Sequence, residues 1–112
     1  MYYFAWYMDN NSTTKQYLIK LVLNSQFHSN EAWTDKEFAL AAGHFDHLKR
    51  LKAEGRLIIA GRTQEPHEHT FGIMIFTADN DEQAQAVLDE DPAVIGGLMI
   101  ASLHPYHVAL MG

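Results

Sequence analysis

The sequence predicts one α+β domain in which a strand–helix–strand unit occurs twice. Two capped helical segments, 34–54 and 80–90, alternate with short apolar segments that have the length of strands. Segments 16–24 and 71–77 carry apolar side chains on both alternating faces, which is typical of central strands. A chain of 112 residues with 47% hydrophobic content is long enough for one such core and too short for two.

The first half of the chain is predicted to contain a strand, a loop over 25–33, a long helix and a strand over 57–61. Thr34 is a helix N-cap with Glu37 three residues later, which forms a reciprocal capping box. Gly55 supplies the left-handed residue that ends this helix. Spacings of three and four predict a buried apolar stripe, made of Phe38, Ala41, Phe45, Leu48 and Leu51 or Lys52.

The second half repeats the pattern. A polar loop over 62–70 precedes strand 71–77, and the second helix, capped by Asp79 or Asn80, ends near Glu90. It ends there because the residue before a proline is disfavoured in the helical region, and residue 92 is proline.

The chain closes with a turn over 93–97 and a long strand over 98–111, which Pro105 restricts to a sheet edge or a bulge. The resulting order, strand–helix–strand–strand–helix–strand, predicts a ferredoxin-like βαββαβ fold with an antiparallel sheet. Right-handed crossovers place both helices on one face of that sheet.

The other face of this sheet has no predicted cover. Both central strands are apolar at both parities, so a bare face would expose on the order of several hundred Å² of apolar surface, about the limit for monomers. A second copy of the same sheet is the simplest cover. We therefore expect a homodimer with the two sheets face to face, in the manner of a dimeric α+β barrel.

Composition narrows the class of partner. The net charge of −6 disfavours nucleic acid and anionic membrane surfaces as partners, and no run approaches the roughly 20 apolar residues of a membrane span. The opening MYYFAWYM lacks the basic leader and cleavage site of a signal peptide, so a cytoplasmic protein is expected. Residues 1–15 are interpreted as an aromatic arm, an extra edge strand or a lid, and 16–112 as the domain. The absence of cysteine excludes thiolate chemistry.

Histidine and aspartate are the candidates for chemistry. His44 lies beside the apolar stripe of the first helix, where core and cleft meet, and histidine titrates near neutral pH. Asp91 follows the second helix, either as a turn-forming residue that bonds nearby amides or as the hydrogen-bond acceptor of His44. In the second case the two form a general acid/base pair.

Other histidines are weaker candidates. His47 lies further toward the polar side of its helix, where we expect it to be solvated and within reach of a substrate. His67 with His69 and His104 with His107 would bind zinc or another transition metal only if the fold brought the two pairs together. Since their spacing matches no metal signature, loop solvation is the favoured interpretation, and we expect no metal or other cofactor.

Four segments of the sequence together resemble the YciI-like (YCII-related) family: HFDHLKRLKAEGRLIIAG, TFGIMIF, DEDPAV and GGLMIASLHPYHVAL. The resemblance spans about residues 16–111 and implies a ferredoxin-like α+β fold, a dimer and a histidine–aspartate active site on His44 and Asp91. The chain departs from the family pattern at Ala41, where an arginine is common. Arg62, at a position where proline is common, is then a candidate to bind an anionic substrate.

These observations lead to two functional hypotheses. The first is a small cofactor-independent enzyme, of the isomerase or lyase type, that moves protons on a small cyclic or aromatic molecule. The second is a ligand-binding or accessory homodimer without chemistry, in which His44 and Asp91 form a structural hydrogen bond.

Overall fold

Four antiparallel strands form one sheet, in the order β2-β3-β1-β4. β1 (Lys15–Leu23) and β3 (Phe71–Ala78) occupy its centre, and β2 (Leu57–Arg62) and β4 (Met99–Tyr106) form its edges. The computed structural model describes residues 14–112, so the predicted arm over 1–15 lies almost entirely outside the described residues.

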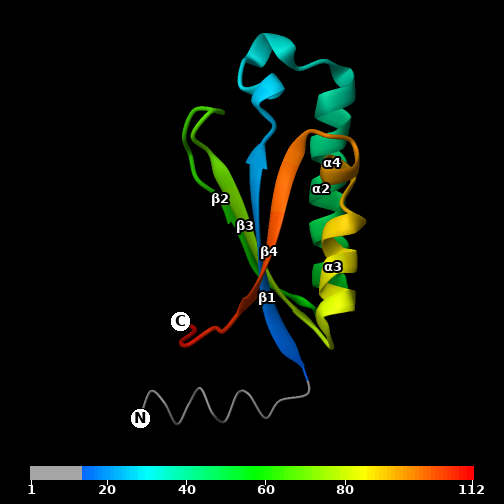
Figure 1. Ribbon diagram of the computed structural model, residues 1–112, viewed down its shortest axis with the longest axis vertical. Coiled ribbons are helices and arrows are strands. Elements are labelled where there is room, and N and C mark those ends of the chain that lie inside the picture. Colours follow the sequence, from blue (N-terminus) through cyan, green and yellow to red (C-terminus); the bar gives the residue numbers. More distant parts are fainter. Residues whose placement is uncertain (1–13) are drawn as a thin grey trace.

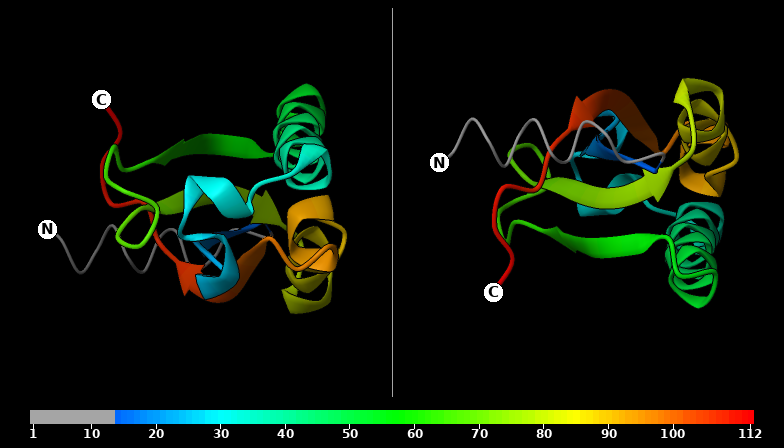
Figure 2. Two further views of the ribbon diagram at one scale, coloured as in Figure 1. Left: turned by 90° about the horizontal axis from the view of Figure 1, so that it is seen from above. Right: turned by 90° about the horizontal axis from the view of Figure 1, so that it is seen from below.

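The helices cover one face of the sheet. Figure 1 shows α2 (Asp35–Ala53), α3 (Asp81–Asp89) and the short α4 (Pro92–Ile95) on the same side of the strands, and Figure 2 shows this layering along the long axis. Two single turns of 3-10 helix, η1 (Ser25–Phe27) and η2 (Asn30–Ala32), connect β1 to α2. The predicted ferredoxin-like α+β fold with an antiparallel sheet is confirmed.

The core lies between the sheet and the helices. Alternate residues of β1 point to the helices, and Tyr17, Ile19 and Leu21 are buried there. Their neighbours across β1 and β3 include Phe76, opposite Tyr17, and Met74, opposite Ile19. The rings of Tyr17 and Phe76 stack with centroids 5.9 Å apart. This period-two pattern fixes the register, because a slip by one residue would turn the core residues to the other face.

The other parity of the same strands forms the outer face of the sheet. There Val22 lies opposite Phe71 on β3 and Ile100 on β4. All three are exposed, as is Ile59 of edge strand β2. No helix among residues 14–112 covers this face (Figure 2). The described residues therefore leave an apolar surface open.

The predicted helix boundaries follow from capping. Thr34 and Glu37 form the reciprocal capping box of α2, and Gly55 adopts the left-handed φ of 74° after its last turn. For α3 the N-cap is Asn80, whose side chain accepts from the Gln83 amide at 2.9 Å. Both helices begin where the sequence predicts.

The predicted buried stripe of α2 is partly wrong. Phe38 and Phe45 are 61% and 60% exposed, whereas Leu51 is buried as expected. Relative to the predicted orientation, α2 is rotated about its axis, because it packs against α4 as well as against the sheet, with Gly43 next to Pro92. Phe45 and Leu48 consequently border a cavity.

The ends of the second half also differ from the prediction. The segment predicted as a turn over 93–97 begins as helix α4, because Asp91 caps it and Pro92 occupies its first position. The last strand ends at Tyr106 rather than at residue 111, directly after Pro105, which has no N–H for a ladder. β4 lies at the sheet edge, as Pro105 predicts. The apolar run LIIA at the start of the strand predicted over 57–61 indicates a buried strand, but β2 is the other edge strand and exposes Ile59.

Candidate functional site

His44 and Asp91 contact each other directly. His44 Nδ1 lies 2.6 Å from Asp91 Oδ2, although 47 positions separate the two residues in the chain. His44 comes from the middle of α2, and Asp91 directly precedes α4. The Asp91 side chain is almost inaccessible, whereas that of His44 keeps 17% of its surface exposed. One partner is thus held inside the protein and the other reaches its surface.

The short contact defines the tautomer of the histidine. An ionised carboxylate only accepts hydrogen bonds, so His44 Nδ1–H is the donor. At 2.6 Å this is a short hydrogen bond, as expected when the acceptor oxygen carries negative charge. Nε2 is then the ring nitrogen left for a ligand. A positive charge on the imidazole would be stabilised by the carboxylate behind it.

The second oxygen of Asp91 has a separate partner. Oδ1 accepts from the Ala93 amide at 3.0 Å and caps α4. The carboxylate is therefore fixed at both oxygens, and its orientation toward His44 does not depend on solvent. The sequence suggests two roles for Asp91, to bond a backbone amide and to accept from His44. In the structure it does both.

A glycine allows α2 and α4 to approach closely at this point. A Cβ on Gly43 would lie 3.0 Å from Pro92 Cβ and 3.2 Å from Pro92 Cγ, which is tighter than most real contacts. Gly43 directly precedes His44, and Pro92 directly follows Asp91. The missing side chain thus brings the two backbones together where the pair forms.

His47 does not occupy the position that the sequence predicts. We expected it to be solvated, but it is 3% exposed, and its Nε2 lies 2.8 Å from the Val87 carbonyl of α3. The reason is the same rotation of α2, which turns His47 toward α3. His44 and His47 thus hold two points of the segment that runs from α3 to α4. Nδ1 of His47 is buried and has no hydrogen-bond partner among the described residues.

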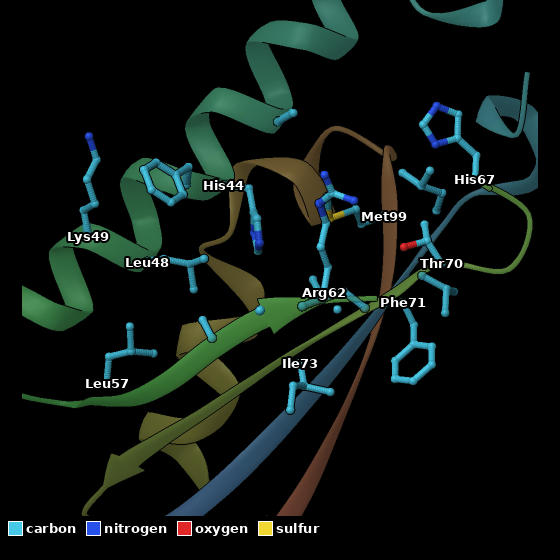
Figure 3. Close-up of a pocket in the computed structure, with 18 of the residues that line it drawn as sticks. His44, Leu48, Lys49, Leu57, Arg62, His67, Thr70, Phe71, Ile73 and Met99 are labelled. Carbon is cyan, nitrogen blue, oxygen red and sulfur yellow. The ribbon is translucent and has the colours of Figure 1, made fainter. Parts of the chain in front are cut away.

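A cavity of about 700 Å³ opens between α2 and the ends of β1, β2 and β3, and it extends past the strands, where Phe71 and Ile73 line it from the opposite side of the sheet (Figure 3). His44, Leu48 and Met99 line it from the helix side of the sheet (Figure 3). His47 is not among its lining residues and borders a different groove, between α2 and α3. The cavity has the size of common small-molecule sites.

Arg62 lies at the end of β2 on the wall opposite the helix. In Figure 3 the Arg62 side chain points away from the strand, toward the same space into which His44 points from α2. Its Nη1 makes one long hydrogen bond, 3.4 Å to the Thr63 carbonyl. The structure therefore brings Arg62 to the cavity that His44 lines.

Two residues that the sequence analysis did not assign to the site close one end of the cavity. Trp33 and His67 stack with ring centroids 5.4 Å apart and an angle of 22° between the rings. Trp33 immediately precedes the N-cap Thr34, and its ring lies 5.3 Å from that of Phe38. This is the arrangement of a hydrophobic staple, a pattern that the sequence carries around the capping box.

The remaining histidines do not gather into a metal site. His67 lies in the loop between β2 and β3, near one edge of the sheet, whereas His104 lies on β4 at the other edge and bonds the Ser102 hydroxyl at 3.0 Å. Within residues 14–112, no group of three or more potential ligands is placed to hold a metal ion.

Comparison with known proteins adds the family. The fold and the facing pair define a ferredoxin-like α+β domain with a histidine–aspartate pair at a cavity. The family model described as the YCII-related domain matches residues 19–103. Because this match covers most of the chain, the protein belongs to the YCII-related domain family. A comparison with curated proteins finds no match.

Solved structures resemble this fold. One is the 5-chloro-2-hydroxyhydroquinone dehydrochlorinase from Burkholderia phenoliruptrix, in complex with 2,5-dihydroxybenzoquinone. It superposes with a TM-score of 0.63 at 17% identity, over 82% of this chain and 93% of the other. At this identity the similarity concerns the fold. No helix within residues 14–112 has the length and apolarity to span a bilayer.

Proposed function

We propose that this protein is a small cofactor-independent enzyme that moves protons on a small cyclic or aromatic molecule, as an isomerase or lyase does. The carrying observation is the 2.6 Å contact between Asp91 and a histidine that lines the cavity. The dehydrochlorinase of similar fold acts on a small aromatic molecule, and its structure contains a quinone ligand. That similarity supports a small cyclic or aromatic molecule as the ligand.

The proposed chemistry uses one proton acceptor. Neutral His44 takes a proton from a C–H or O–H of the substrate at Nε2, and the electron pair of that bond stays on the substrate. The imidazolium is stabilised by the Asp91 carboxylate at Nδ1–H. It then returns the proton to another atom of the same molecule in an isomerase, or to the leaving group in a lyase.

The test is proton exchange in heavy water. A panel of small cyclic and aromatic acids, phenols and enols is incubated with the protein, and loss of C–H signals is followed by NMR. For any compound that exchanges, His44→Gln is expected to lower the rate by about 10²- to 10⁴-fold, the usual contribution of a general acid/base. His69→Gln, at a histidine whose side chain is 66% exposed, is the control and should leave the rate unchanged. An unchanged rate in His44→Gln would contradict the proposal.

A second function, ligand binding without chemistry, is favoured by the cap that Asp91 places on α4. Asp91→Asn separates the two, since an amide oxygen still accepts from the Ala93 amide but carries no charge to stabilise an imidazolium. If the protein is an enzyme, Asp91→Asn should stay folded and lose the proton exchange with the substrate. The binding hypothesis expects unchanged ligand affinity, and a loss of stability in His44→Ala.

We also propose that the protein assembles as a homodimer through the outer face of its sheet. The exposed apolar residues Val22, Phe71 and Ile100 lie side by side across three strands and support a face-to-face arrangement. Burial of such a surface is favourable by about 25 cal/mol for each Å².

A further inference from the structure

We propose that the ligand of the cavity is a planar organic anion, held by Arg62 at its charged group and by the Trp33–His67 pair at its ring. The proposal rests on the proposed function because it concerns the same cavity. It names a charge and a shape that the histidine–aspartate pair alone does not specify.

The sign of charge follows from the cavity lining. The chain has 14 acidic and 8 basic residues, so a random set of charged residues would be mostly acidic. The charged residues of the lining are instead Lys49, Lys52 and Arg62. The nearby carboxylate of Asp91 lies behind His44 and is occupied by two hydrogen bonds. The cavity therefore favours an anion within an acidic protein.

Arg62 is better placed than Lys49 to bind that anion. Lys49 is 3.3 Å from Asp46 and lies over the ring of Phe45, so part of its charge is already compensated. Arg62 forms no ion pair with any residue in 14–112, and its single hydrogen bond is 3.4 Å long. A guanidinium presents two parallel N–H groups that match the geometry of a carboxylate.

The preference for a flat ring follows from the other end of the cavity. Trp33 is fixed because its Nε1–H donates to the Phe27 carbonyl at 2.9 Å. His67 lies in a loop closed by Thr63 and Thr70, where Thr70 Oγ1 donates to the Thr63 carbonyl at 2.8 Å. Two loops distant in the sequence thus hold a pair of rings at one end of the cavity. Stacking on such a pair favours a planar ligand over a puckered one.

A set of four probes separates charge from shape. Benzoate has a planar ring and is anionic, and cyclohexanecarboxylate is anionic but has a puckered ring. Benzamide has a planar ring but is neutral, and benzylamine has a planar ring and is cationic at neutral pH. Binding to the full chain is measured by titration calorimetry. We expect benzoate to bind most tightly, about tenfold or more tighter than benzamide, since a charge-assisted bond contributes about 1.5–3 kcal/mol. Its advantage over cyclohexanecarboxylate should be about three- to tenfold.

Two variants assign the preferences to residues. Arg62→Gln should reduce the affinity for benzoate to that for benzamide and leave benzamide binding nearly unchanged. His67→Leu should reduce the preference for benzoate over cyclohexanecarboxylate, because one of the two stacked rings is lost while the charge remains. The matched control is Arg56→Gln, an arginine outside this cavity whose Nε donates to the Thr77 carbonyl at 3.3 Å. It should change neither preference.

The result that overturns the proposal is benzylamine or benzamide binding as tightly as benzoate, or Arg62→Gln leaving benzoate affinity unchanged. Failure of all four probes to bind at millimolar concentration also contradicts it. These outcomes are independent of the exchange experiment, in which His44 and Asp91 are changed and His69 is the control. A protein that binds benzoate as expected but shows no exchange would keep the anion site and lose the enzymatic function.

Discussion

At the scale of single residues, the buried hydroxyl of Tyr17 makes stability depend on alkaline pH. This hydroxyl lies at the end of the core near α3 and donates a hydrogen bond of 2.6 Å to Asp81 Oδ1. Burial first, and then the hydrogen bond and negative charge of Asp81, raise the pKa of Tyr17 to about 12. The folded protein therefore resists losing this proton more than the unfolded chain does.

The direction of the pH effect follows from that shift. The contribution of a raised pKa is fully present below the unfolded value near 10, and it is lost as the pH rises through about 12. A pKa difference of two would correspond to about 2–3 kcal/mol in full, and solvent screening at the partly buried contact with Asp81 reduces this to about 1–2 kcal/mol. We expect the free energy of unfolding, measured with urea, to fall by about this amount more between pH 9 and 12 in the native protein than in Tyr17→Phe. Parallel curves for the two proteins would refute it.

The positions of individual site residues could be predicted from the sequence only in part. The sequence predicts both His44 and Asp91 as site residues, because the segments that resemble the family and their local context mark them, and their side chains lie 2.6 Å apart in the structure. His47 was assigned to solvent and is buried. Its position on the helix surface depends on where α3 packs, and a single-helix pattern contains no information on that contact.

At the scale of elements, the close packing of α2 on α4 controls the candidate site. Gly43→Ala would put a Cβ 3.0 Å from the rigid ring of Pro92. The crowding lowers the free energy of unfolding by about 1–3 kcal/mol, and the higher helix propensity of alanine raises it by up to about 1 kcal/mol. We expect a stability loss of about 0–3 kcal/mol and a displaced Asp91. The measurement is the low-field NMR signal of His44 Nδ1–H, which should weaken or shift.

Gly61→Ala provides the matched control for this prediction. A Cβ there meets nothing within 4 Å, so neither the stability nor the His44 signal should change appreciably. If the low-field signal of Gly43→Ala is identical to that of the native protein, close helix packing does not position the pair.

The elements themselves were predictable because their signals are local. Caps at Thr34 and Asn80, the left-handed Gly55 and the effect of Pro105 all operate within a few residues. The rotation of α2 was not predictable in the same way. Phe38 and Phe45 follow a helical period that correctly indicates an apolar side, but tertiary contacts turn that side toward the cavity and Trp33.

At the scale of the whole molecule, the open sheet face carries the dimer proposal. Ile100 is 56% exposed on β4, next to Val22 in the register. A charge there would be buried without a partner in a face-to-face dimer, which is strongly unfavourable. We expect Ile100→Lys to halve the mass that light scattering measures at micromolar concentration. The domain should stay folded, since the residue faces away from the core.

The control for this experiment is Ile95→Lys. Ile95 is 70% exposed on α4, in the helix layer rather than on the open face of the sheet. This variant should keep the mass of the native protein. A native protein that is already monomeric would contradict the dimer, and so would equal masses for the native protein and Ile100→Lys.

The separate origins of the two parts of the cavity have a consequence for how such proteins diversify. The pair of His44 and Asp91 is fixed by helix packing and by the cap on α4, whereas Trp33 and His67 come from loops. Loops accept substitutions and insertions with little cost to the scaffold. A lineage built on this fold can therefore acquire new ligands by substitutions in its loops while the geometry of the histidine–aspartate pair is inherited unchanged.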